Sequence, residues 1–257
     1  MDKSINEAEK ILAIGFEKIA EFGEHYVTRY LDELLKNKGL SKESILDDWW
    51  HAFKFFCGKC FYQGRRDQTS KVIEKNTLEI LEDFLGETIA DKEDKITHLQ
   101  EEGHLDLKHL NGNEALKDLH NSLLKHNKIL QKLVERKKGR DRDRLMAINL
   151  MSLMVNLPDK NLVKYFKQLI EEENIEKAYN ELKSVISIKD KIASFILRDI
   201  VLLYNLEDKV SEIDQVFIQP IDTWLRKIAL AMMNKKLKEA KISIAKFNAG
   251  AWYYSTQ

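Results

Sequence analysis

The sequence predicts an all-α protein, and its composition and patterning carry this prediction. The chain of 257 residues contains only two prolines and ten glycines, which are few turn-forming residues for a sheet protein of this length. Charged residues make up 33% and hydrophobic residues 44% of the chain, and the two kinds are mixed throughout. Such mixing is typical of amphipathic helices that pack on one another.

Helical periodicity is nearly continuous, and several helix starts carry recognisable signals. Asn113 precedes an apolar periodic run, and we expect Pro158 in the first turn of a helix. Asp190 is expected to cap a helix that begins at Lys191. The polar segment 87–112 is expected to be a loop-rich connection. The expected helices are 4–21, 24–37, 43–62, 68–86, 113–136, 141–156, 159–171, 174–185, 190–205, 221–234 and 236–254.

We expect these helices to form two lobes. The basic stretch ERKKGRDRDR joins two predicted helices and is a plausible boundary. It divides the chain into a lobe of residues 1–136 and a lobe of residues 137–257, and the terminal helices can pack across this division. The length is sufficient for a substantial core in either arrangement.

Charge is unevenly distributed although the formal net charge is zero. Residues 79–106 contain ten acids and two lysines, a local net charge of −8. Residues 223–257 contain seven Lys or Arg and one Glu, a local net charge of +6. The basic end can mark a polyanion-binding face, and the alternative is ordinary segregation of charge on solvated faces.

The sequence argues against several classes of protein. No apolar run reaches the roughly 18 residues needed to span a bilayer, and the N-terminal segment is too acidic for a secretory signal. Cys57 and Cys60 form a lone CxxC in an aromatic helix, which favours core packing over a zinc site or redox pair. The histidines at 98, 104 and 109 do not share a helix face. We therefore expect a cytoplasmic protein, nucleoid-associated when on DNA, with no metal, no cofactor and no membrane partner.

Three segments of the C-terminal half carry the candidate chemistry. The first, NIEKAYNELKSVISIKDKIASFILRDIV, predicts two helices joined by a tight hairpin, and such a turn ahead of a helix start can bind phosphate. The second, FIQPIDTWLRKIA, places Asp222 in the first turn of a helix that Pro220 begins. The third, KFNAGAWYY, places Asn248 and Trp252 one turn apart on one face.

This order of segments resembles the helix-hairpin-helix DNA glycosylases of base-excision repair, most closely the archaeal 8-oxoguanine DNA glycosylases. The resemblance rests on a K-x-A motif that starts at Lys191 and a P-[IV]-D motif that ends at Asp222, and it covers roughly residues 174–257. It implies a helix-hairpin-helix motif at the cleft between the two lobes. It also implies that Lys191 is the Schiff-base nucleophile and that Asp222 is the catalytic carboxylate.

The implied reaction explains why a lysine opens an apolar helix. Excision of a damaged base needs a nucleophile at the sugar C1′ and a carboxylate that stabilises positive charge on the sugar. A neutral amine can attack C1′ and form an imine, which permits strand cleavage by β-elimination. The expected activity is therefore that of a DNA glycosylase and AP lyase, with 8-oxoguanine as the expected base.

Such enzymes flip the target base into a pocket. Phe195 and Arg198 follow Lys191 at i+4 and i+7 on one face, and the resemblance implies that they line this pocket. The resemblance places Asn248 as a polar base-edge contact and Trp252 as a stacking aromatic. Gln63 in FYQGRRD is a further candidate for an edge contact.

Basic residues and the hairpin turn are the candidates for phosphate contacts. Most turns of this superfamily contain glycines in an LPGVG-like pattern, whereas this turn reads VISIK. We expect a glycine-free turn to hold phosphate less closely or through a different geometry. The phosphate-contact candidates are Ser187, Lys189, Arg226 and Lys227, with Arg65, Arg66, Lys235 and Lys236 as weaker ones.

Three alternatives stay open from the sequence. The first is a glycosylase for another damaged or mispaired base. The second is a non-catalytic helix-hairpin-helix DNA-binding protein, which an exposed Lys191 or a distant Asp222 would favour. The third is a helical protein–protein scaffold. The expected partner is double-stranded DNA containing a damaged base, bound by a monomer.

Overall fold

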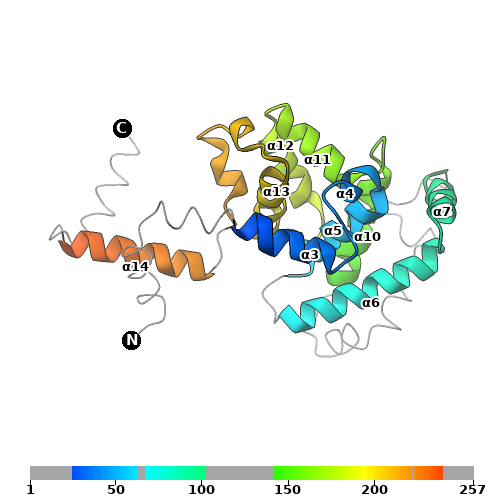
Figure 1. The fold of residues 1–257 in the computed structure, drawn as a ribbon, viewed down its shortest axis with the longest axis horizontal. Helices are drawn as coiled ribbons and strands as arrows, with labels where there is room; N and C mark the ends of the chain where they lie inside the picture. The colour runs from blue at the N-terminus through cyan, green and yellow to red at the C-terminus, as the bar shows by residue number, and fades with distance from the viewer. Residues whose placement is uncertain (1–24, 63–66, 102–141, 221–222, 240–257) are drawn as a thin grey trace. The chain divides into compact units, whose positions relative to one another are not determined.

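A computed structural model describes residues 25–62, 67–101, 142–220 and 223–239 of the chain. All regular secondary structure in these ranges is helical, which confirms the predicted all-α class (Figure 1). The chain divides into two compact units, one of residues 1–31 with 221–257 and one of residues 32–220. The smaller unit contains the π-helical η1 (Tyr26–Leu31) and α14 (Thr223–Glu239) among the described residues.

The larger unit contains the remaining described helices. They are α3 (Asp32–Lys36), α4 (Ser44–Asp47), α5 (Trp49–Cys60), α6 (Asp67–Leu85), α7 (Ile89–Glu101), α10 (Arg142–Val155), α11 (Leu162–Glu171), α12 (Ile175–Ser184), α13 (Asp190–Tyr204), and the 3-10 helices η3 (Glu207–Lys209) and η4 (Asp214–Ile218). Helices from both sides of the predicted boundary at residue 137 lie within this unit. The boundary itself stays a prediction, because residues 102–141 lie outside the described residues.

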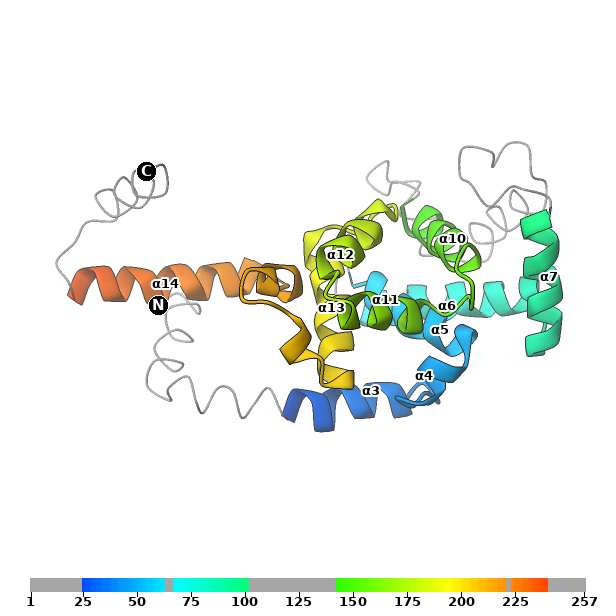
Figure 2. The ribbon, with the colours of Figure 1, turned by 90° about the horizontal axis from the view of Figure 1, so that it is seen from above.

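Helix α5 forms the centre of the larger unit. It packs against α4, α6, α10, α11 and α13 (Figures 1 and 2). Phe53 and Phe56 are fully buried, and the Phe56 ring stacks on Phe166 of α11 with ring centroids 5.6 Å apart. Cys57 and Cys60 are buried and form no disulfide, and burial raises the pKa of both thiols, in agreement with the predicted core packing. Aromatic burial on all sides of one helix therefore organises the core.

Side-chain capping sets several helix boundaries. Asp48 has extended backbone angles and accepts hydrogen bonds from the backbone N–H groups of Trp50 and His51 at 2.7 and 3.0 Å. This cap divides the predicted helix 43–62 into α4 and α5. The predicted helix start at Pro158 is wrong, because α11 begins at Leu162 after the capping residue Asn161.

Two further predictions from periodicity are wrong. The expected loop 87–112 contains α7, which is started by a reciprocal capping pair. The Thr88 hydroxyl accepts from the backbone N–H of Asp91, whose carboxylate accepts from the backbone N–H of Thr88. The expected break near residue 235 is absent, since α14 is continuous from Thr223 to Glu239 and contains no proline or glycine. The expected helices 4–21 and 113–136 lie outside the described residues.

Helices α12 and α13 pack against each other and are joined by the five residues 185–189. This pair occupies the predicted positions 174–185 and 190–205 to within one residue. The predicted capping role of Asp190 is wrong, because Lys189 is the N-cap and Asp190 is the first residue of α13. In the described part of the chain, no helix has both the length and the apolar character to cross a bilayer.

Candidate functional site

The candidate site is one face of α13. Lys191 lies in the first turn of this unbroken helix and is exposed, whereas Phe195 and Arg198 are half-buried. Residues at i, i+4 and i+7 share a helix face. The structure therefore brings together three of the residues that the sequence predicts for nucleophile and base pocket.

A buried ion pair that the sequence did not predict lies beside this face. Lys59 of α5 and Asp199 of α13 are almost completely buried, and Lys59 Nζ lies 2.5 Å from Asp199 Oδ2. Burial lowers the pKa of Lys59, and the Asp199 carboxylate partly offsets this effect. The two residues are 140 positions apart, so no local pattern connects them. The available signal was a charged residue within each of two apolar helices, because such residues are seldom buried unless paired.

Asp199 also holds Arg198. The Arg198 guanidinium donates to Asp199 Oδ1 from Nε at 3.1 Å and from Nη2 at 2.8 Å. Arg198 Cζ and Lys59 Nζ each lie 4.8 Å from the centroid of the Phe195 ring. Both cations thus contact the aromatic ring at cation–π distance. We call these four residues, Lys59, Phe195, Arg198 and Asp199, the Lys59–Asp199 cluster.

The hairpin turn between α12 and α13 has an unusual backbone. Ser187 has a φ of 72°, in the left-handed region that glycine adopts without strain. The backbone N–H of Ile186 donates to the Asn149 side chain at 2.7 Å. Among the described residues, the backbone N–H groups of Ser187, Lys189 and Asp190 find no acceptor. The Ser187 hydroxyl oxygen is buried and has no partner among them either.

Asp190 of α13 forms polar contacts that link the two helices of the hairpin. Its Oδ1 accepts from the Tyr179 hydroxyl at 2.8 Å and lies 2.6 Å from Lys183 Nζ, and both partners come from α12. These hydrogen bonds, that of Lys183 first, lower the pKa of Asp190. Burial and the bond to Asp190 raise the pKa of Tyr179 to about 12. The first turn of α13, which contains Lys191, is therefore fixed to α12.

The other predicted site residues lie outside the described residues or on α14. Gln63, Asp222, Asn248 and Trp252 lie outside the described residues, as do Arg65 and Arg66. Arg226 and Lys227 lie on α14, and their side chains are not described. Lys235 and Lys236, also on α14, are exposed. The pairing of Lys191 with Asp222 thus stays a prediction.

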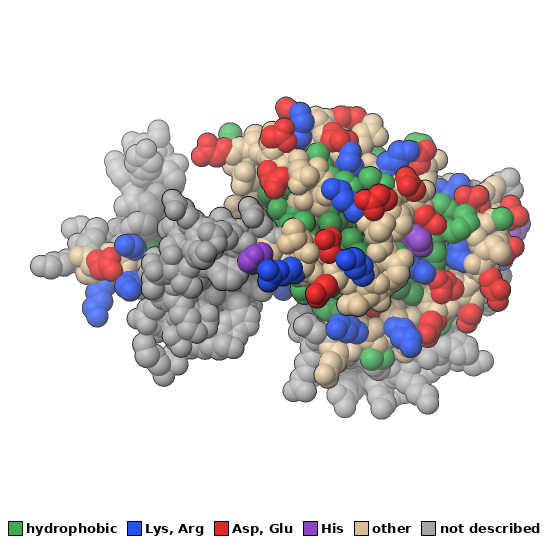
Figure 3. Space-filling model, viewed as in Figure 1, with side chains coloured by type: hydrophobic (Ala, Val, Ile, Leu, Met, Phe, Trp, Pro, Cys, Tyr) green, Lys and Arg blue, Asp and Glu red, His purple; other side chains and the backbone are tan. Residues whose placement is uncertain are grey.

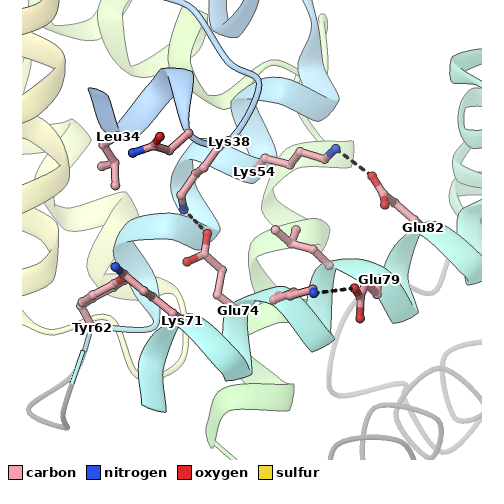
Figure 4. A pocket seen from close by; sticks show the side chains of 11 residues that line it. Leu34, Lys38, Lys54, Tyr62, Lys71, Glu74, Glu79 and Glu82 are labelled. Carbon is pink, nitrogen blue, oxygen red and sulfur yellow. Dashed lines mark hydrogen bonds and ion pairs between the residues drawn. The ribbon is translucent and has the colours of Figure 1, made fainter. Parts of the chain in front are cut away.

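A pocket of about 460 Å³ opens between α3, α5 and α6 (Figure 4). Its charged side chains pair with one another: Lys38 with Glu74, and Lys54 with Glu82 at 2.7 Å. Burial alone would raise the pKa of Glu82, but hydrogen bonds from Lys54 and Trp50 outweigh it and lower the pKa. None of the predicted site residues that the structure describes lines this pocket. We therefore place the candidate site on α13.

The surface carries no uniform charge on the face drawn in Figure 3, where acidic and basic side chains are mixed over the described part. No group of three or more His, Cys, Asp or Glu residues that could hold a metal ion occurs among the residues that the structure describes. No family model matches the chain, and comparison with curated proteins and with solved structures gives no match.

Proposed function

We propose that the chain is a DNA glycosylase with AP lyase activity that excises an oxidised purine, 8-oxoguanine, from duplex DNA. The observation that carries the proposal is the position of Lys191. It is the second residue of α13, directly after the hairpin turn, and shares its helix face with an aromatic and a cationic side chain, Phe195 and Arg198. Together these residues supply an amine nucleophile, a stacking surface and a hydrogen-bond donor.

The backbone of the hairpin turn supports DNA binding. In an LPGVG-like turn the first glycine corresponds to Ser187, and Ser187 keeps the positive φ that glycine would adopt there. Backbone N–H groups without a protein acceptor, ahead of a helix start, are the groups that bind phosphate in such turns. The contact at Ser187 would involve the backbone, because its hydroxyl oxygen is buried.

In the proposed reaction, Lys191 is first the nucleophile that displaces the base and then the nitrogen of the imine that permits strand cleavage. Its neutral amine attacks C1′, the bond from C1′ to the base breaks, and the base leaves with the bonding electrons and takes up a proton. The sugar ring then opens to an imine between Lys191 and C1′. Loss of a proton from C2′ expels the 3′ phosphate by β-elimination, and hydrolysis of the imine restores the amine. Asp222 would stabilise the positive charge that develops on the sugar.

A non-catalytic DNA-binding protein is the second candidate, and the exposure of Lys191 favours it. Most lysines on a protein surface are simply solvated and have no catalytic role. DNA would have to cover Lys191 in the complex for the first proposal to hold, because desolvation favours the neutral amine. Both candidates predict DNA binding that weakens steeply with salt, whereas a protein–protein scaffold predicts none.

Borohydride trapping distinguishes these candidates. The substrate is a duplex with 8-oxoguanine opposite cytosine, and undamaged and abasic duplexes serve as controls. A covalent adduct with the 8-oxoguanine duplex that is lost in Lys191→Gln supports the proposed function. An adduct with the abasic duplex alone supports a lyase for a different base. Binding without any adduct supports the non-catalytic candidate.

A further inference from the structure

The Lys59–Asp199 cluster has a feature that core packing alone does not explain. Two opposite charges are removed from water in the interior, next to the helix face that carries Lys191. The desolvation of a buried ion pair can exceed its Coulombic gain, and apolar side chains of similar volume often stabilise a fold as well or better. A buried pair is therefore weak evidence of a role in stability alone.

The contacts of the pair reach Arg198 and Phe195, the two described residues that are expected to line the base pocket. The two carboxylate oxygens of Asp199 are used separately, Oδ2 by Lys59 and Oδ1 by the Arg198 guanidinium. Lys59 fixes the carboxylate from α5, and the carboxylate holds the guanidinium at two nitrogens. An arginine side chain is long and has many rotamers, so an oxygen that accepts from two of its nitrogens reduces the freedom it would lose on binding a base.

The Phe195 ring is the second group that the pair positions. Lys59 Nζ and Arg198 Cζ both lie 4.8 Å from its centroid. Arg198 keeps 27% of its side-chain surface exposed, and Phe195 is half-buried. Both groups are thus held from inside the protein and stay accessible on the Lys191 face.

We propose that Lys59 and Asp199 are positioning residues that hold Arg198 and Phe195 for recognition of the flipped base. In this proposal they act through these two side chains. The inference rests on the proposed function and adds to it the residues that confer base selectivity. It predicts that loss of the pair impairs excision of the damaged base far more than cleavage at a site where the base is already missing.

The test compares two apolar double variants of the full chain. Lys59→Met/Asp199→Leu removes the pair and leaves no unpaired buried charge. Lys38→Met/Glu74→Leu is the control, because it removes another ion pair of the same unit, one that joins the end of α3 to α6 and lines the pocket of Figure 4. Single-turnover rates are measured on an 8-oxoguanine duplex and on a pre-formed abasic duplex, and thermal unfolding shows that each variant is folded.

In the Lys59→Met/Asp199→Leu variant we expect excision to fall about 100-fold and abasic cleavage to change less than about threefold, as misplacement of a binding group predicts. The control should keep both rates. In an Arg198→Gln background the double substitution should cause little additional loss, because the pair acts through Arg198. Equal losses on both substrates, or full additivity with Arg198→Gln, would overturn the inference.

Two further outcomes are decisive. If the Lys59→Met/Asp199→Leu variant does not fold, Arg198→Gln and Phe195→Leu take its place, and unchanged excision in both overturns the inference. If the unsubstituted chain forms no Lys191-dependent adduct, the proposed function fails and the inference fails with it. If the wild type excises the damaged base and the variant keeps the wild-type ratio of base excision to abasic cleavage, the proposed function stands and only the inference is rejected.

Discussion

Lys59 Nζ lies 2.5 Å from Asp199 Oδ2 in the interior of the larger unit, and this pair joins α5 to α13. Asp199→Ala should lower the free energy of unfolding by about 3–5 kcal/mol, because it leaves the Lys59 ammonium buried and unpaired. Lys59→Met/Asp199→Leu should cost far less, since neither charge is buried in that variant. Urea denaturation measures both. A double variant that is less stable than Asp199→Ala would contradict this account.

The positive φ of Ser187 predicts a stabilising substitution. A non-glycine residue in the left-handed region costs roughly 1–2 kcal/mol. Glycine removes that cost but adds conformational freedom to the unfolded chain worth about 0.4–1 kcal/mol. Ser187→Gly should therefore raise the free energy of unfolding by about 0.5 kcal/mol. Ser187→Ala is the control, because it removes the unpartnered hydroxyl and keeps the strained backbone. An equal gain in both variants would show that the hydroxyl, and not the backbone, is the source.

The contacts of the Asp190 carboxylate with Lys183 and Tyr179 predict that the hairpin loses stability in acid. Lys183 and Tyr179 hold its pKa below the unfolded value of about 3.9. The folded state thus binds fewer protons, so the contribution is complete above the unfolded pKa and is lost as pH falls through the lower folded pKa. The difference in urea midpoint between the wild type and Asp190→Asn should shrink in that window. A difference that is constant from about pH 6 to pH 2 would show that the carboxylate charge contributes nothing.

Asn161 is the best cap in the described chain to test by substitution. Its Oδ1 accepts from the backbone N–H of Lys164 at 2.8 Å, and its Nδ2 donates to the backbone oxygens of Ile45 and Leu46. Asn161→Ala removes a cap, one buried and one part-buried hydrogen bond and should cost about 2 kcal/mol. Asn174 is an exposed N-cap residue without a side-chain cap bond, so Asn174→Ala should cost less than about 0.5 kcal/mol. Equal costs in a denaturation series would contradict this assignment.

Periodicity predicted the helices well, and local side-chain chemistry decided where it failed. The helices at 67–85, 142–155, 175–184 and 190–204 match their predicted ranges closely, because each carries a strong amphipathic or apolar pattern. Helix α7 was mistaken for a loop because its polar composition hid the capping pair of Thr88 and Asp91. A search for the T-x-x-D pattern would have found its start.

The candidate site was predictable only where its residues share one helix. The family resemblance pointed to Lys191, and helical spacing places Phe195 and Arg198 on the same face. Lys59 lies 140 residues from Asp199 and meets it only through the packing of α5 on α13, which no pattern in one sequence specifies. The positive φ of Ser187 could not be predicted from the sequence either, since serine carries no preference for that backbone region.

The central claim is that Lys191 is the nucleophile, and peptide mapping of the borohydride-reduced adduct tests it most directly. The 8-oxoguanine duplex is trapped on the wild-type chain, the complex is digested, and the modified lysine is located by mass spectrometry. The account predicts a sugar remnant on Lys191 and none on its neighbour Lys189, which is also exposed. A remnant on any other lysine, or no adduct with damaged DNA that the chain binds, would contradict it.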